Sequence, residues 1–218
     1  EYDNFEIIII IDDPNDLCIE KKLIKFMNDN PTYLIKVIKN YENSGAYLSR
    51  NIGIFNSTGE YIYTLDPDDT IIPKKFILEL ELFKKHNVDI INSKYIRKCL
   101  KTGKNITEAK YGEPGTTFHR KVFIQEGFYD KNRFAADTEF RLRIFKYYKY
   151  KRYRFDEITE IKTYDESEKS NNLTYLYKLD SRKQYVNEYT NWHKNNIEQE
   201  FFIKNKYTIY ESLKYNYQ

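Results

Sequence analysis

The stretch "YTLDPDDTIIP" (residues 63–73) places three aspartates within four positions, directly after a short apolar segment. Asp66, Asp68 and Asp69 repel one another unless a cation or a proton compensates their charge. We therefore interpret the stretch as a buried strand that ends at a binding site. Carboxylate oxygens suit Mg²⁺ or Mn²⁺, which proteins bind through one or two carboxylates together with substrate phosphates. The alternative is that these aspartates only cap helices and shape turns.

The pattern around this stretch alternates between strands and helices. Residues 5–11, 34–38, 61–65 and 88–92 are apolar runs of strand length, and we expect the first to be buried on both faces. Apolar residues at helical spacing predict three intervening helices, marked by Ile19, Leu23, Phe26 and Met27, by Leu48, Ile52 and Phe55, and by Phe76, Ile77, Leu80 and Phe83. This order predicts an α/β fold with a mainly parallel central sheet between helices.

Three local signals refine this prediction. Gly59 is predicted to cap the C-terminus of the second helix. The glycine-containing segment 93–136 is predicted to be irregular, with a helix starting at Asp137. Asp12 and Asp13 follow the first strand, so we expect them on the same rim of the sheet as the aspartate cluster. Five carboxylates would then converge on one edge.

Composition limits the class of protein. The 218 residues, 40% of them hydrophobic, fit one domain or one domain with an appendage. The net charge of +3 does not indicate a nucleic-acid partner, and "KYYKYKRYRF" (146–155) is interpreted as a helix end, a turn and an edge strand. No apolar run approaches the ~20 residues of a membrane span. Cys18 and Cys99 are interpreted as free thiols, so we expect a cytoplasmic location.

Four blocks of the sequence carry a family resemblance. They are "FEIIIIIDDPND" (5–16), "NSGAYLSRNIGIFNSTGEYIYTLDPDDTIIP" (43–73), "TTFHRKVFIQEGFYD" (116–130) and "AADTEFRLRI" (135–144). In this order they resemble family 2 glycosyltransferases of the GT-A fold. The resemblance implies a glycosyltransferase domain over residues 1–168 and a helical C-terminal extension over 169–218. The family's first strand has no counterpart before residue 5, so we expect an N-terminal truncation.

The resemblance also implies an activity. A sugar would pass from a nucleotide-diphosphate donor, expected to be a UDP-sugar, to a hydroxyl of a glycan, lipid or protein, with inversion. The positions that match the family's site are Asp13, Arg50 and Asp66 for the nucleotide, Asp68 and Asp69 for Mn²⁺ or Mg²⁺, and Asp137 for the general base. Thr117, His119 and Glu139 are expected to line the sugar or acceptor pocket, with Glu139 as an alternative base. A homodimer through the C-terminal region is a further expectation.

Two other functions stay open at this point. The stretch "DPDDT" (66–70) fits the D-x-D-x-T pattern of haloacid-dehalogenase phosphatases, with Asp66 as nucleophile and Asp68 as acid and base. That reading needs a later acidic pair, and the sequence offers no convincing one. The third possibility is a catalytically degenerate module that binds a sugar without transferring it.

Overall fold

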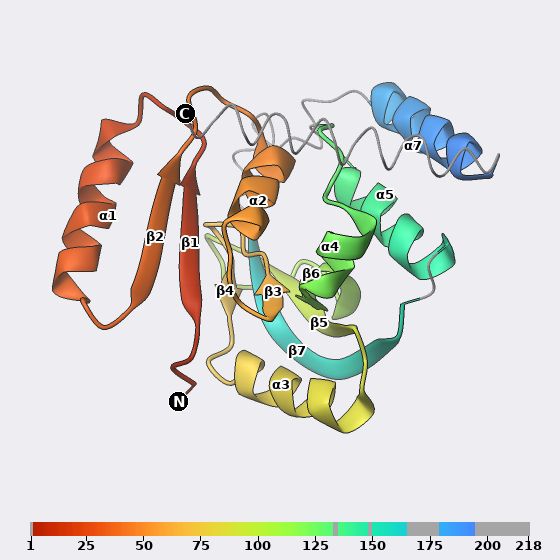
Figure 1. Cartoon of the computed structure of the whole chain (residues 1–218), viewed down its shortest axis with the longest axis horizontal. Coiled ribbons are helices and arrows are strands. Elements are labelled where there is room, and N and C mark those ends of the chain that lie inside the picture. Colours follow the sequence, from red (N-terminus) through yellow and green to blue (C-terminus); the bar gives the residue numbers. More distant parts are fainter. Residues whose placement is uncertain (1, 133–134, 148–149, 165–178, 195–218) are drawn as a thin grey trace.

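The computed structural model describes residues 2–132, 135–147, 150–164 and 179–194 (Figure 1). The strands are β1 (Glu6–Ile11), β2 (Leu34–Lys39), β3 (Tyr61–Tyr63), β4 (Thr70–Ile71), β5 (Ile90–Cys99), β6 (Lys110–His119) and β7 (Arg152–Tyr164). The helices are α1 (Leu17–Asp29), α2 (Ala46–Phe55), α3 (Lys75–His86), α4 (Lys121–Glu126), α5 (Ala136–Leu142), the π-helical turn η1 (Arg143–Tyr147) and α7 (Leu179–Lys194).

The strands form two sheets. β1 and β2 pair in parallel, and the larger sheet has the order β3-β6-β5-β7-β4. In the larger sheet only β5 and β7 are parallel, and the other three pairings are antiparallel. The predicted α/β class is confirmed, but a mainly parallel arrangement is wrong for this sheet. The reason is that β6 directly follows β5 and returns beside it, which reverses the strand direction.

Two local predictions are also wrong. The segment 93–136 contains most of β5 and all of β6, whose strand pattern is hidden by Gly112, Pro114 and Gly115. Gly115 has φ +76°, and a Cβ there would lie 2.7 Å from the Ser93 carbonyl oxygen, so the close approach of the two strands requires glycine.

Gly59 is not the cap of α2. The helix ends at Phe55, and Asn56 caps it, with its backbone N–H and its side-chain amide both donating to the Ile52 carbonyl. The capping function is met by an asparagine side chain, so the helix ends before the glycine is reached.

The apolar core lies against the larger sheet, under α4 and α5. Phe118, Phe123, Tyr129 and Phe140 pack ring against ring and are almost completely buried. The Phe123 and Phe140 rings stack with centroids 5.0 Å apart. Such aromatic packing fixes the helices on which the candidate general base is placed.

A buried polar network lies on the α3 side of the same sheet. Lys75 is fully buried, with its Nζ 2.6 Å from Glu79 Oε1 and 3.1 Å from Thr159 Oγ1. Glu79 also accepts hydrogen bonds from Ser93 and Thr117. Buried charges persist only when they are paired and hydrogen-bonded. The network therefore ties α3 to β5, β6 and β7.

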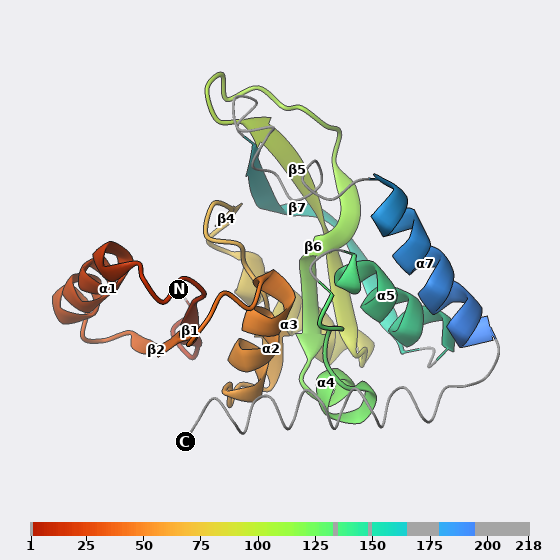
Figure 2. The ribbon, with the colours of Figure 1, turned by 90° about the horizontal axis from the view of Figure 1, so that it is seen from above.

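Residues 6–39, which form β1, α1 and β2, make a more thinly covered unit, here called the N-terminal unit (Figure 2). Five of the six β1 residues are only half-buried, α1 has no buried residue, and Leu34 is 67% exposed. The prediction that residues 5–11 are buried on both faces is therefore wrong. Within the described ranges, β1 pairs with a strand along one edge only. Glu6 links the unit to the remainder by accepting hydrogen bonds from the Thr58 and Gly59 amides.

Helix α7 lies beside α5 in both views (Figures 1 and 2). Tyr185 donates a hydrogen bond to Asp130 at 2.8 Å, which attaches α7 to the loop before α5. This helix is the described part of the expected extension, and residues 169–178 and 195–218 lie outside the described residues. Among the described helices, none is long and apolar enough to cross a membrane. Both cysteines are free thiols, as predicted.

Candidate active site

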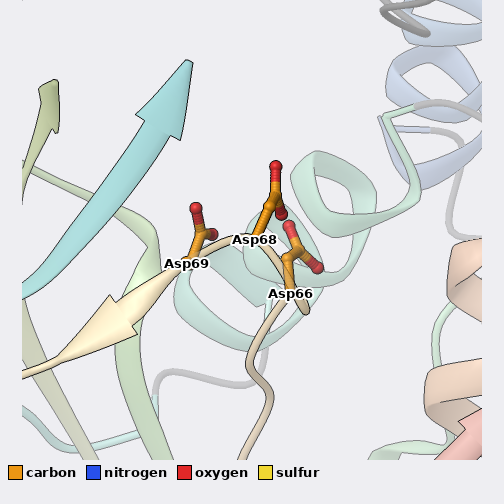
Figure 3. Close-up of side chains that lie close together, drawn as sticks. All are labelled: Asp66, Asp68 and Asp69. Atoms are coloured by element: carbon orange, nitrogen blue, oxygen red, sulfur yellow. The ribbon is translucent and has the colours of Figure 1, made fainter. Parts of the chain in front are cut away.

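The three aspartates lie on the turn between β3 and β4, and their side chains project to the same side of it (Figure 3). One carboxylate oxygen from each of Asp66, Asp68 and Asp69 lies within 4.8 Å of the other two. β4 pairs antiparallel with β7, so the Thr163 amide reaches the turn and donates to Asp69 Oδ1 at 3.1 Å. This donor set of hard oxygens fits Mg²⁺ or Mn²⁺.

Two protein cations already compensate part of the charge. Lys162 Nζ lies 3.0 Å from Asp66 Oδ2 and 2.6 Å from Asp69 Oδ2, and Arg50 Nη2 lies 2.5 Å from Asp66 Oδ1. Burial alone would raise the pKa of Asp66, but Arg50 and Lys162 lower it to about 2. Burial raises the pKa of Asp69. Asp68 is exposed and has no hydrogen-bond or ion-pair partner among the described residues, which leaves it available to a ligand.

Helix α2 connects this cluster to the candidate general base. Tyr47 and Arg50 lie one helical turn apart, and the Arg50 guanidinium sits 5.2 Å above the Tyr47 ring. Arg50 reaches Asp66, whereas the Tyr47 hydroxyl donates to Asp137 Oδ1 at 2.7 Å. Burial and the neighbouring Asp137 raise the pKa of Tyr47, so it remains a hydrogen-bond donor. Two side chains of one helix thus hold Asp66 and Asp137.

Asp12 and Asp13 follow β1, which belongs to the smaller sheet, so the expectation of five carboxylates on one rim of one sheet is wrong. The carboxylates that lie within 4.8 Å of one another are those of Asp66, Asp68 and Asp69. The Asp12 carboxylate accepts hydrogen bonds from the Ser44 and Gly45 amides at 2.8 and 2.9 Å, and from the Asn40 side chain. It thereby fixes the residues that begin α2. Asp13 is exposed, and its Oδ1 accepts from the Asn15 amide.

A second acid, Glu113 on β6, interacts electrostatically with Asp137 and was missed from the sequence. Its Oε1 accepts a hydrogen bond from the buried Tyr129 hydroxyl, whereas its buried Oε2 has no hydrogen-bond partner among the described residues. Burial and Asp137 raise the pKa of Glu113 to about 7. Tyr129 is held by Asn51, whose side-chain amide bonds both its backbone N–H and its C=O. With Tyr47 and Tyr129 rings 5.8 Å apart, two tyrosine–carboxylate pairs stand side by side.

The structure does not bring Thr117, His119 and Glu139 to the cluster. Thr117 is buried and donates to Glu79, and Glu139 is fully buried in a bidentate pair with Arg143 at 2.8 and 3.1 Å. The spacing of four residues within a helix is the signal that could have predicted this pair.

His119 pairs in the sheet with Tyr61, at the start of β3, whereas the cluster follows the end of β3. Its Nε2 lies 3.6 Å from Glu60, and burial and Lys121 lower its pKa. The histidine therefore lies at the far end of the strand from the cluster.

Solved structures with the same arrangement define the class of fold. TarS of S. aureus in complex with UDP superposes with a TM-score of 0.60 at 16% identity, over 73% of this chain and 51% of that one. Mannosyltransferase PcManGT from Pyrobaculum calidifontis, in complex with GDP-Man and Mn²⁺, gives 0.56 at 11% identity, over 72% and 47%. GalNAc-T7 with UDP, GalNAc and Mn²⁺ gives 0.57 at 17% identity, over 73% and 38%. The fold is the GT-A fold.

The chain belongs to glycosyl transferase family 2, whose family model matches residues 1–159. A Haemophilus influenzae glycosyltransferase is 32% identical over 89 residues, which is 40% of this chain and 28% of that protein. A Rickettsia conorii glycosyltransferase is 30% identical over 129 residues, which is 56% and 18%. The chain thus spans less than a third of the length of these curated relatives. The family membership argues against the phosphatase interpretation of residues 66–70.

Proposed function

We propose that this chain transfers a sugar from a nucleotide-diphosphate donor to an acceptor hydroxyl with inversion. The observation that carries the proposal is the pair of contacts made by α2, which joins Asp66 through Arg50 and Asp137 through Tyr47. The same helix turn thus supports Asp66, which pairs with Arg50 and Lys162, and Asp137, which interacts with the buried Glu113. UDP is the proposed nucleotide, supported by TarS structures that contain UDP and UDP-GlcNAc.

The donor side of the site is assigned to the β3–β4 turn. Asp68 and Asp69 would hold Mn²⁺ or Mg²⁺, and Asp66, fixed by Arg50, would orient the nucleotide. A bound divalent cation supplies a Lewis acid that neutralises the negative charge of the departing diphosphate. Asp13, exposed at the end of β1, is the proposed contact to the nucleotide base.

The acceptor side is assigned to Asp137. As the acceptor oxygen forms its bond to the anomeric carbon and the diphosphate leaves, Asp137 takes the hydroxyl proton. One displacement on the opposite face inverts the anomeric configuration. Tyr47 holds one carboxylate oxygen in place, so Tyr47 is a positioning residue. Base catalysis of this kind accelerates transfer by about 10²–10⁴-fold.

The broader parts of the proposal concern partners and organisation. The acceptor is a glycan, lipid or protein hydroxyl, and the transferase domain ends near residue 168. A homodimer through residues 169–218 belongs to the same proposal. Sedimentation equilibrium on the whole chain and on a variant lacking these residues would test the dimer.

The decisive experiment measures nucleotide release with a panel of UDP- and GDP-sugars, beside UDP binding by calorimetry with and without Mn²⁺. Asp137→Asn is expected to lower kcat by about 10²–10⁴-fold and leave the Kd for UDP unchanged. Asp68→Asn is expected to abolish the effect of Mn²⁺ on UDP binding. Asp156→Asn, an exposed aspartate paired with Lys94, is the matched control. Folded protein that binds no nucleotide diphosphate would overturn the proposal, and binding without turnover would favour the degenerate sugar-binding module.

A further inference from the structure

Lys162 occupies the place where a cation is expected. Its ammonium lies within 3.0 Å of both Asp66 and Asp69, between two of the three carboxylates that lie within 4.8 Å of one another. A divalent ion bound to the same oxygens would sit 2.0–2.6 Å from them. Its position would overlap that of the Lys162 ammonium. The metal and the ammonium therefore compete for the same oxygens.

The charges of the cluster support this competition. Within the described part of the chain, the three carboxylates are paired with two cations, Arg50 and Lys162, which leaves one negative charge uncompensated there. A divalent ion added beside Lys162 would bring the cluster to an excess of positive charge. If Lys162 turns away first, the ion meets two uncompensated charges instead of one.

The two cations differ in how firmly they are held. Arg50 is placed over the Tyr47 ring, and its planar fork fixes it against Asp66. Lys162 has a flexible four-carbon stem and an 18% exposed side chain, so its ammonium can move. Its backbone stays fixed because the neighbouring Ile161 is paired with both β4 and β5. Asp69 also stays in place, since the Thr163 amide holds its other oxygen.

We propose that Lys162 serves as a counter-ion of the aspartate cluster until a divalent cation displaces its ammonium. The displaced ammonium then binds the diphosphate of the donor. The inference rests on the proposed function and goes beyond it. It makes Lys162 a diphosphate-binding residue and an internal competitor of the metal. An ammonium freed from Asp66 and Asp69 remains within side-chain reach of the phosphates that the metal binds, and it donates strong charge-assisted hydrogen bonds to phosphate oxygens.

The test measures two affinities on the same protein: that for Mn²⁺ alone, and that for UDP at saturating Mn²⁺, both by calorimetry. In Lys162→Met, Mn²⁺ is expected to bind about tenfold more tightly or better, because a positive charge a few ångströms away is removed. UDP is expected to bind about tenfold more weakly, because a charge-assisted phosphate contact is lost. A merely structural role would not move the two affinities in opposite directions.

The controls keep the inference distinct from the proposed function. Lys162→Arg retains the charge and is expected to leave UDP binding nearly unchanged, and Lys162→Gln serves if the Met variant does not fold. Lys94→Met removes a more exposed lysine–aspartate pair elsewhere on the sheet, so it controls for the general loss of one positive charge. Unchanged or weaker Mn²⁺ binding in the Met and Gln variants overturns the inference, as does unchanged UDP binding. Wild-type protein that binds neither ligand overturns the proposed function as well.

Discussion

β1 and β5 are both isoleucine-rich strands, yet the chain buries them to very different degrees. Ile90 and Ile91 of β5 are completely buried, with strands paired along both edges. The isoleucines of β1 from Ile7 to Ile10 are only half-buried, since β2 is the single strand paired to them in the described ranges. A run of β-branched residues therefore predicts a strand, whereas the strands paired along its two edges determine how much of its surface is buried.

The largest difference in stability is expected when one ion pair is broken in each of the two regions. Lys75–Glu79, at 2.6 Å, is fully buried in the larger sheet, whereas Lys39–Glu20, at 2.8 Å, is more than a third exposed at Glu20. Lys75→Met is expected to lower the free energy of unfolding by about 3–5 kcal/mol, because Glu79 keeps an unpaired buried charge. Lys39→Met is expected to lower it by about 0–1 kcal/mol. Urea denaturation of both variants checks this, and equal losses would refute the contrast.

Shortening one isoleucine in each strand gives the next largest effect. Ile90→Ala is expected to lower the free energy of unfolding by about 2–5 kcal/mol, because it leaves a cavity in a packed core. Ile9→Ala is expected to cost about 1 kcal/mol, because less apolar surface returns to water. Chemical denaturation measures both values. A loss at Ile9 as large as that at Ile90 would show that the N-terminal unit is packed more tightly than its exposure indicates.

The pH dependence of stability is expected to differ between a buried acid of the larger sheet, Glu113, and the carboxylates of the N-terminal unit. The folded pKa of Glu113, about 7, lies above its ordinary value of 4.5, so folding favours the protonated acid. Its stabilisation is complete below about pH 4.5 and is lost as the pH rises through 7. The facing groups that contribute to the shift are Asp137, Arg50, Arg141 and Tyr129.

Glu113→Gln is therefore expected to flatten the stability profile between pH 4.5 and 7 by about 2–3 kcal/mol. Thermal unfolding followed across this range provides the measurement. Glu20→Gln, which changes an exposed carboxylate of the N-terminal unit, should leave the profile close to that of the wild type. A profile that stays equally steep in Glu113→Gln would contradict the assignment.

The smallest effect concerns the link between the two regions. Glu6 accepts hydrogen bonds from the Thr58 amide, the Thr58 hydroxyl and the Gly59 amide. Glu6→Ala is expected to reduce stability by only about 0.5–1.5 kcal/mol, since these groups are partly open to water. Hydrogen exchange should nevertheless become faster in β1 and β2 and stay unchanged in β5. Faster exchange across both sheets would mean that the two regions unfold together.

Part of the candidate site has local signals in the sequence. The crowding of Asp66, Asp68 and Asp69 predicted a cation, and the resemblance implied that Arg50 and Asp66 both serve the nucleotide; in the structure these two side chains form an ion pair. The partners that complete the site come from far along the chain. Lys162 is 96 residues from Asp66 and reaches it only through the register of β4 on β7, and Tyr47 is 90 residues from Asp137. No local pattern encodes such register.

The errors have an equally physical origin. Thr117 and Glu139 were expected to line the sugar or acceptor pocket because of their positions in family-like blocks. In the structure a buried hydrogen bond to Glu79 engages Thr117, and a buried ion pair with Arg143 engages Glu139. The strand β6 was hidden because Gly112, Pro114 and Gly115 are tolerated there by the irregular β5–β6 register. Propensity describes an average environment, and tertiary contacts override it at such places.

Helix α2 presents Tyr47, Arg50 and Asn51 to Asp137, Asp66 and Tyr129, respectively. Because each residue of an α-helix is rotated by about 100° from the last, inserting one residue between 47 and 50 would turn these side chains to different directions. Insertions at the turn around residues 100–104, between β5 and β6, carry no such penalty. Among homologous proteins, insertions and deletions should therefore occur in the turn around residues 100–104 and be absent from α2. The spacing of the three α2 residues is expected to stay constant.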